Sequence, residues 1–239
     1  MKYYKFKEKL GEGIIRNHPN RFIMDIEIDG KLEKAHCPVT GKIGSFDFKN
    51  TPCLFSISKN PKRKTKYTIE AISKNKPESK RKSWIGINQA RSNDYVEFFL
   101  KNNFMEKIIS KNSEILREKK LGNSRIDFQI GNIFLEVKTF VWNIPGPDQV
   151  KNKPPMVLDR LIKHFSDLAE FAKKENGRAI VLICSQYKAE PFIPPKNSEN
   201  TEIGKTVRRA ISDGVENWQV NLKFTPRGVY FDDYFKLAF

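Results

Sequence analysis

Hydrophobic and polar residues alternate in two short runs between Arg125 and Lys138, with the dipeptide Gly131-Asn132 between them. Both residues of this dipeptide tolerate positive φ, so the pattern predicts a β-hairpin with a two-residue turn. Side chains alternate along a strand, so each face of the hairpin has its own composition. The predicted apolar face carries Ile126, Phe128, Ile130, Ile133, Leu135 and Val137. The opposite face carries Arg125, Asp127, Glu136 and Lys138.

The charged face places Asp127 opposite Glu136, and like charges in that position destabilise a strand pair. A divalent cation such as Mg²⁺ or Mn²⁺ between the two carboxylates would relieve this repulsion. Lys138 lies on the same face, where it could orient a water molecule or balance phosphoryl charge. Asp followed by Glu-x-Lys is the pattern of the PD-(D/E)xK nucleases, whose metal activates water. The alternative is a surface hairpin with Asp127–Arg125 and Glu136–Lys138 ion pairs, and the spacing leaves both interpretations open.

The first 85 residues contain short strand patterns and no convincing helix. The predicted strands are residues 22–29, 31–37, 54–58, 67–73 and 84–88, and Asp29-Gly30 forms a hairpin turn between the first two. Short strands at this spacing predict a small β-barrel, for which the OB-fold is the common nucleic-acid-binding version.

Basic loops join these strands. Lys62, Arg63 and Lys64 could follow a phosphate backbone, as could the loop over residues 76–82. Stacking partners for bases would be Phe22, Phe46 or Phe48. The alternative is that these loops are ordinary solvated loops and that the aromatic residues belong to the core.

From about residue 86 helical and strand patterns alternate. The predicted elements are a helix over 93–102, a strand over 114–120, the hairpin, a helix over about 156–175 and a strand over 178–185. This α-β-β-β-α-β order matches the minimal PD-(D/E)xK core. A helix near 201–213 and a strand pair around 225–228 follow. The predicted fold class is therefore α+β, with an OB-like barrel over residues 1–85 and a PD-(D/E)xK nuclease-like α/β domain over residues 86–239.

The helix near 156–175 has an apolar stripe and a polar side. The stripe consists of Val157, Leu161, Phe165, Leu168 and Ala172. On the polar side, Arg160, Lys163 and His164 recur at helical spacing and could contact substrate phosphate. The alternative is a solvated helix face. Glu97 on the preceding helix could add a third carboxylate to the metal site; otherwise it is a surface glutamate.

The charge balance favours a polyanionic partner. The 239 residues include 44 Lys and Arg against 28 Asp and Glu, a formal net charge of +16. Nucleic acid is the usual partner of such an excess, although AT-rich genomes also encode lysine-rich proteins. The longest apolar run, residues 179–184, is far shorter than a membrane span requires. Three scattered cysteines form neither a disulfide framework nor a zinc pattern. We expect a cytoplasmic protein, and leave a homodimer open.

Several blocks of the sequence, in this order, resemble the sugar fermentation stimulation protein A family. The blocks are Arg21-Phe22, residues 35–38 with 40–41, residues 60–64 with 67–68, residues 84–88, 124–128 and 136–138, and Arg160 with Lys163-His164. The resemblance implies an N-terminal OB-like domain, a PD-(D/E)xK-like domain and DNA binding linked to sugar metabolism genes, notably those of maltose. The chain departs from the family at Val39, at Gln89 and at Leu161-Ile162, where the family has Gly-Gln.

These observations predict a protein that binds single- or double-stranded DNA and cleaves it with a divalent metal. Asp127 and Glu136 would hold Mg²⁺ or Mn²⁺, Lys138 would orient the attacking water, and Arg125, Arg160 and Lys163 would steady the phosphate. One alternative is a non-catalytic DNA-binding regulator of sugar metabolism genes. Another is an RNA-binding module in which the barrel performs the recognition.

Overall fold

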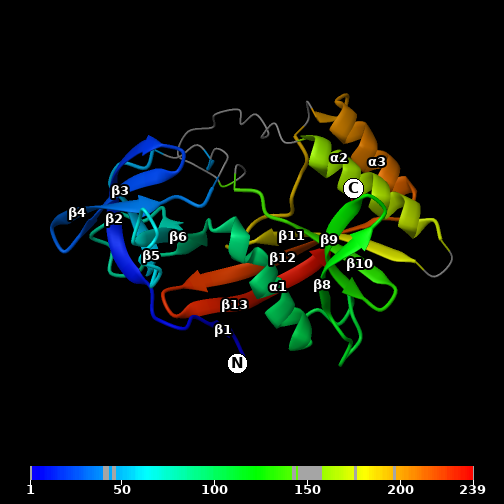
Figure 1. Ribbon diagram of the computed structural model, residues 1–239, viewed down its shortest axis with the longest axis horizontal. Coiled ribbons are helices and arrows are strands. Elements are labelled where there is room, and N and C mark those ends of the chain that lie inside the picture. The colour runs from blue at the N-terminus through cyan, green and yellow to red at the C-terminus, as the bar shows by residue number, and fades with distance from the viewer. Residues whose placement is uncertain are drawn as a thin grey trace.

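The computed structural model describes residues 2–39, 43–44, 47–141, 144, 158–174, 177–195 and 198–238. The barrel lies at the left of Figure 1 and an α/β part at the right. The strands before residue 88 are β1 (Tyr4–Lys5), β2 (Gly11–Asn20), β3 (Ile23–Ile28), β4 (Lys31–His36), β5 (Thr51–Ile57), β6 (Tyr67–Ser73) and β7 (Trp84–Gly86). The elements of the second part are η1 (Gln89–Arg91), α1 (Ser92–Lys101), β8 (Leu116–Leu121), β9 (Ser124–Ile130), β10 (Ile133–Lys138), α2 (Leu158–Ala172), β11 (Arg178–Ser185), α3 (Glu202–Ser212), β12 (Glu216–Thr225) and β13 (Gly228–Lys236).

Five strands close into a barrel in the order β2-β3-β4-β6-β5, and β5 pairs back with β2. The closure depends on a parallel pairing of β4 with β6, in which Ala35 lies opposite Tyr67. Asp29 and Gly30 both have positive φ, as the predicted turn between β3 and β4 requires. Inside the barrel, Met24, Ile26 and Ile69 are fully buried. The predicted OB-like barrel is confirmed.

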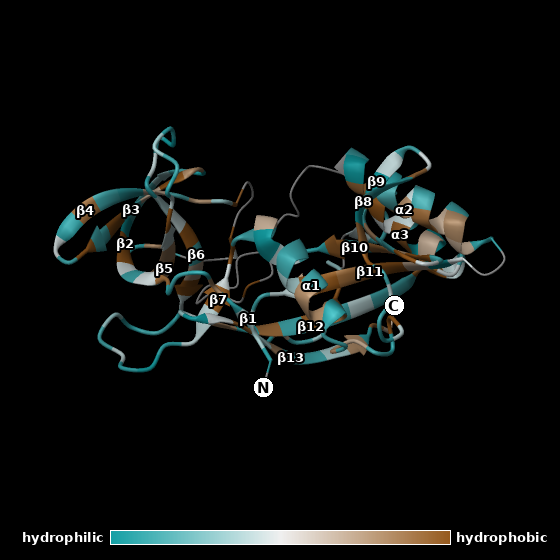
Figure 2. Cartoon of the chain, turned by 60° about the horizontal axis from the view of Figure 1, so that its bottom comes forward, coloured by the Kyte–Doolittle hydropathy of each residue, from teal (hydrophilic) through white to brown (hydrophobic). Residues whose placement is uncertain are grey.

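The second part is a mixed sheet with helices on both faces. Strands β10, β11 and β12 are parallel, while β8 and β9 extend the sheet in antiparallel fashion. α1 packs on one face through Tyr95 and Phe99, and α2 covers the other face through Phe165 and Leu168. Parallel strands covered on both faces are apolar throughout, and β10 and β11 are accordingly mostly brown in Figure 2. The order α1-β8-β9-β10-α2-β11 is the α-β-β-β-α-β order predicted from the sequence.

One continuous sheet joins the barrel to the second part. β7 pairs with β6 of the barrel and also with β12, where Phe224 lies opposite Trp84. The predicted domain division at residue 85 therefore falls within the strand that connects the two parts. β1 pairs with β13, and Phe6 and Leu10 are buried in the core under α1. The first ten residues thus pack with the second part, although residues 1–85 were predicted to form the barrel.

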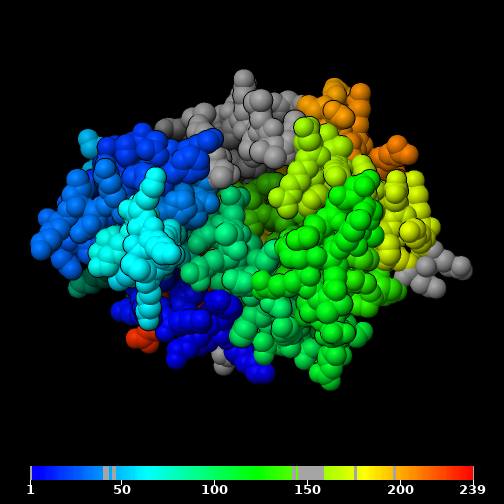
Figure 3. All heavy atoms as spheres, viewed as in Figure 1, coloured from blue at the N-terminus to red at the C-terminus, as the bar shows by residue number. Residues whose placement is uncertain are grey.

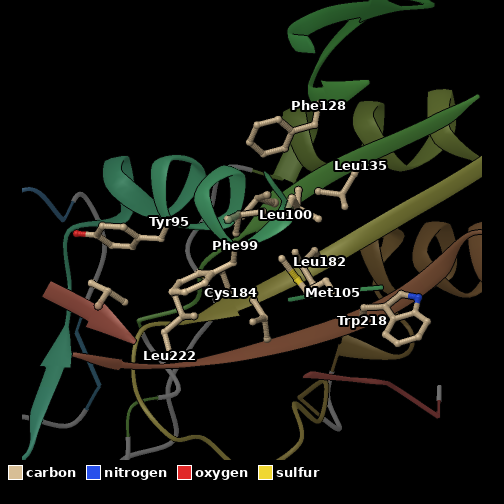
Figure 4. Close-up of a cluster of buried hydrophobic side chains, with 14 of the residues drawn as sticks. Tyr95, Phe99, Leu100, Met105, Phe128, Leu135, Leu182, Cys184, Trp218 and Leu222 are labelled. Carbon is tan, nitrogen blue, oxygen red and sulfur yellow. The ribbon is translucent and has the colours of Figure 1, made fainter. Parts of the chain in front are cut away.

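The β9–β10 hairpin has the predicted register. Ile133 lies opposite Ile130, and Leu135 lies opposite Phe128. The side chains of Phe128 and Leu135 point into the cluster beneath α1, as Figure 4 shows. The expectation of one purely apolar and one purely charged face is wrong, because the sheet is covered on both sides. Phe134 and Ile126 are buried in the cluster beneath α2.

The helix predicted over 156–175 is α2, whose stripe residues Leu161, Phe165, Leu168 and Ala172 pack in the cluster beneath it. Val157 and Phe46 lie outside the described residues. In the part of the chain that the structure describes, no helix has the length and apolar character needed to cross a membrane.

A half-buried ion pair at the start of β11 and β12 gives a stability test. The Arg178 Nε donates to Glu216 Oε1 at 2.5 Å, and the Trp218 indole N–H donates to Glu216 Oε2 at 2.8 Å. Burial alone would raise the pKa of Glu216, but the hydrogen bonds from Arg178 and Trp218 lower this pKa to about 2. Because the folded pKa lies below the unfolded value, the stabilisation is complete above about pH 4.5 and is lost as the pH falls towards 2.

We predict that Glu216→Gln lowers the free energy of unfolding at pH 7 by about 1 kcal/mol, since water partly screens this pair. The difference from the wild type should shrink as the pH falls from 4.5 towards 2, and urea denaturation at several pH values measures it. Glu114→Gln, at an exposed glutamate, serves as the control and should change little. A Glu216→Gln effect independent of pH would show that the ion pair does not stabilise the fold.

Candidate active site

The β9–β10 hairpin holds Asp127 and Glu136 just beyond its last regular pair, Phe128–Leu135. There each carboxylate accepts a hydrogen bond from a backbone N–H of the opposite strand. The Val137 N–H donates to Asp127 Oδ2 at 2.8 Å, and the Asp127 N–H donates to Glu136 Oε2 at 3.3 Å. Each carboxylate is thus fixed by the strand that carries the other, which places the two acids side by side as the sequence predicted.

Glu136 is a buried carboxylate, with 2% of its surface exposed. Lys138 Nζ donates to its Oε1, and His164 Nδ1 lies 2.6 Å from the same oxygen. Arg160 Nε donates to His164 Nε2 at 3.4 Å, so the imidazole carries its proton on Nδ1 and donates that proton to Glu136. Burial raises the pKa of Glu136, but the hydrogen bond from His164 and the charge of Lys138 outweigh it and lower this pKa overall. Glu136 is therefore held ionised.

The pKa of Asp127 is shifted in the opposite direction. Burial, and then the negative charge of Glu136, raise the pKa of Asp127 above its usual value. Hydrogen bonds from the Val137 N–H and from Asn93 Nδ2, which donates to Asp127 Oδ1 at 2.8 Å, offset only part of this rise. Ionisation of Asp127 beside Glu136 is consequently less favourable in the folded protein than in water. A cation bound between the two carboxylates would remove this cost.

Glu97 does not approach the carboxylate pair. Its Oε1 accepts a 2.7 Å hydrogen bond from Lys101, and its Oε2 pairs with Arg117. α1 instead presents Asn93 to Asp127, one helical turn before Glu97. Within the described ranges, no group of three or more His, Cys, Asp or Glu residues is arranged to hold a metal. The structure therefore offers two protein carboxylates, and the predicted third ligand is not among them.

Of the three α2 residues predicted to contact phosphate, two lie on the surface and one lies in the site. Arg160 and Lys163 are exposed, as a phosphate contact requires, but His164 is only 4% exposed and lies against Glu136. His164 was predicted to contact phosphate; the structure places it as a hydrogen-bond donor to the carboxylate instead. Arg125 is exposed on β9. The surface-hairpin alternative is right about the Glu136–Lys138 ion pair but wrong about exposure, because Glu136 is buried.

The barrel residues predicted to bind nucleic acid lie apart from this site in the sequence. Lys62, Arg63 and Lys64 are exposed in the loop between β5 and β6. Figure 3 shows the cyan residues of this part of the chain on the visible surface of the barrel. Phe22 is 42% exposed, with the Arg21 guanidinium 4.5 Å from its ring centre. Phe48 is partly buried against the barrel core, in line with the core alternative.

Sequence reasoning missed Asn93 and a group of buried polar residues around the start of α1. Ser92 Oγ lies 2.7 Å from Thr139 Oγ1, and Gln186 Nε2 donates to Ser92 Oγ at 2.9 Å. Asn93 is the first residue of the helix predicted over 93–102, and its spacing of four from Glu97 places the two residues on the same helix face. That spacing was the one signal in the sequence that could have identified it.

Comparisons with known proteins cover nearly the whole chain. Residues 17–87 match the model of the SfsA N-terminal OB domain, and residues 90–228 match that of the sugar fermentation stimulation protein RE domain. The sugar fermentation stimulation protein homolog of Bdellovibrio bacteriovorus is 30% identical over 240 residues, which cover 94% of this chain and 95% of that protein. The homolog of Microcystis aeruginosa is 29% identical over 231 residues, which cover 93% and 92%.

A solved structure has the same fold. SfsA of Pyrococcus furiosus, determined in complex with Ca²⁺, superposes with a TM-score of 0.76 at 19% sequence identity, and the match covers 100% of this chain and 98% of that one. The agreement extends over both the barrel and the α/β part.

The repulsion between Asp127 and Glu136 predicts a stability change. Because the pKa of Asp127 is raised on folding, its ionised form costs stability at neutral pH, and the free energy of unfolding of the wild type relative to Asp127→Asn should rise by about 1 kcal/mol as the pH falls from 7 towards 3.8. Below about pH 3.8 Asp127 is protonated in both the folded and the unfolded protein, so the difference should change no further. Asp232→Asn, at an exposed aspartate of β13, should change stability by less than about 0.5 kcal/mol. A difference between the wild type and Asp127→Asn that does not change with pH would contradict the repulsion.

Proposed function

The chain belongs to the sugar fermentation stimulation protein family, and on this premise we propose that it is a DNA-binding protein that hydrolyses phosphodiester bonds with a divalent cation. The observation that carries the proposal is the close pairing of Asp127, whose pKa is raised, with the buried Glu136, whose pKa is lowered. A pair of this kind is costly to the fold, and such costs are concentrated at functional sites.

The donor atoms fit Mg²⁺ or Mn²⁺. Both ions accept carboxylate oxygens, and Mg²⁺ typically takes one or two protein carboxylates and completes its shell with water and phosphate oxygens. Among the described residues, the one donor to Glu136 Oε2 is the Asp127 N–H at 3.3 Å, so this oxygen keeps acceptor capacity for a cation. The Pyrococcus furiosus relative was solved in complex with Ca²⁺, an ion with the same preference for oxygen ligands. We take this as support for a divalent cation in this chain.

A bound divalent cation would supply Lewis-acid stabilisation of the charge that develops on the phosphate. The chain's own residues do the rest. Asp127 and Glu136 would hold the ion, while Asn93 and His164 fix the orientation of these two carboxylates. Lys138, next to Glu136, would orient the attacking water and balance the negative charge of the phosphoryl group.

DNA would reach this site along basic surfaces on both parts of the chain. Arg160 and Lys163 are exposed on α2, and Arg125 is exposed on β9. On the barrel, Lys62, Arg63 and Lys64 could follow the phosphate backbone and Phe22 could stack on a base, since OB-folds bind nucleic acid through such loops. The net charge of +16 favours this polyanionic partner.

A second candidate is a DNA-binding regulator without catalysis. The favouring observation is that Glu136 Oε1 already accepts hydrogen bonds from both Lys138 and His164. These two donors compensate the buried carboxylate from within the chain, so the geometry of Glu136 would also suit a purely structural cluster. Only a measurement of turnover separates the two functions.

We predict that the purified protein cleaves DNA with Mg²⁺ or Mn²⁺ and not with EDTA. Asp127→Ala should abolish cleavage, and Lys138→Ala should reduce kcat by about 10²–10³-fold, the size expected for loss of one group that stabilises a charged transition state. Gel assays on single- and double-stranded substrates measure cleavage, with DNA binding measured alongside.

The matched control is Lys119→Ala, which removes an exposed lysine of β8 and should cleave like the wild type. Tight DNA binding without turnover, unchanged in Asp127→Ala, would favour the regulator. Metal-dependent turnover that survives in both Asp127→Ala and Lys138→Ala would show that cleavage occurs elsewhere.

A further inference from the structure

A buried carboxylate connects the barrel to the start of α1. Glu70 on β6 is 1% exposed, and its two oxygens have different partners. From the barrel, Ser56 Oγ donates to Oε1 at 2.5 Å. From the segment before α1, Asn88 Nδ2 donates to Oε2 at 2.8 Å, and Arg91 Nε lies 3.3 Å from the same oxygen. A buried charge is tolerated only with such partners, so Glu70 and this segment constrain each other's position.

The same segment leads directly into the first turn of α1. Asn88 precedes the short helix η1, Arg91 is the last residue of η1, and α1 begins at Ser92. Gln186, at the end of β11, donates both to the Asn88 carbonyl and to Ser92 Oγ, each at 2.9 Å. Asn88 is 6% exposed, Ser92 is 2% exposed and Gln186 is 1% exposed. Buried polar networks of this kind favour one arrangement of the elements they join.

The first turn of α1 contacts both strands of the candidate active site. Ser92 Oγ bonds to Thr139 Oγ1, in the residue that follows Lys138. Asn93 Nδ2 donates to Asp127 Oδ1 on β9. A displacement of this turn would therefore move the support of Asp127 and the end of β10 together.

We propose that Glu70 is a positioning residue for the carboxylate site. It fixes the first turn of α1 against the barrel, so that Asn93 holds Asp127 in the orientation that faces Glu136. Through this contact the placement of the barrel, where DNA is expected to bind, determines the geometry of the site that would hold the metal. The effect on metal binding rests on the proposed function, whereas the positioning of Asn93 does not.

The chain provides variants that separate positioning from general stability. Glu70→Ala and Asn88→Ala break the connection to α1, and Ser56→Ala removes only the hydrogen bond from the barrel side. The backbone bonds from Ile87 N–H to the Glu70 carbonyl and from Gly86 N–H to the Gln186 carbonyl are not altered by any of these substitutions. Glu70→Gln keeps the shape and one acceptor oxygen and should give an intermediate result.

The first measurement is the ¹⁵N–¹H resonance of the Asn93 side-chain amide, which reports its hydrogen bond to Asp127. We expect this resonance to move towards that of a solvated amide in Glu70→Ala and Asn88→Ala and to stay in place in Ser56→Ala. The second measurement is Ca²⁺ affinity by calorimetry. The dissociation constant should rise at least about tenfold in Glu70→Ala and Asn88→Ala, as for loss of other groups that orient metal ligands.

An unchanged Asn93 resonance in Glu70→Ala and Asn88→Ala would overturn the proposal. An equal shift in Ser56→Ala would also overturn it, because the effect would then follow from loosening of the barrel. If the wild-type protein binds no Ca²⁺, Mg²⁺ or Mn²⁺, the proposed metal-dependent function fails, and the Asn93 resonance alone decides whether Glu70 positions the site.

Discussion

The burial of the Glu136 carboxylate is the constraint on which the candidate site depends. A charge 2% exposed inside a sheet must be compensated, and the chain compensates it with Lys138 from the same strand and His164 from α2. This requirement fixes α2 over the hairpin and explains why His164 turns inward while Arg160 and Lys163 remain at the surface. It also leaves Asp127 beside an ionised neighbour, and burial together with this neighbour raises the pKa of Asp127, a cost that the proposed cation would offset.

The candidate site depends on the contacts between the two parts of the chain as well as on the carboxylates themselves. β7 continues the barrel into the sheet, β1 pairs with β13, and Glu70 joins the barrel to the segment before α1. If the chain binds DNA on the barrel and cleaves it at the carboxylates, as proposed, a fixed relation between the two parts would keep the bound DNA aligned with the site. Continuous strand pairing and buried polar contacts provide such a relation more rigidly than a linker.

Features encoded locally could be predicted from the sequence. The Gly131-Asn132 turn specified the hairpin register, Asp29-Gly30 specified the turn between β3 and β4, and the alternation of helix and strand gave the α-β-β-β-α-β order. The inward position of His164, the contact of Asn93 with Asp127 and the pairing of β1 with β13 could not be predicted. Each of these contacts joins residues that are 28 or more positions apart in the sequence. Periodicity indicates which face of an element a residue occupies, but not what packs against that face. Glu97 shows the same limit. It lies on α1 as predicted, but its carboxylate pairs with Arg117 and Lys101 instead of with the site formed by Asp127 and Glu136.

The measurement that tests the central claim most directly is calorimetric titration of Mn²⁺ into the wild type, Asp127→Asn and Glu136→Gln, with Glu97→Gln as the matched control. If the two carboxylates hold the cation, the wild type and Glu97→Gln bind Mn²⁺ with similar affinity, and Asp127→Asn and Glu136→Gln lose most of that affinity. Binding of equal strength in all four proteins, or no binding in the wild type, would contradict the account.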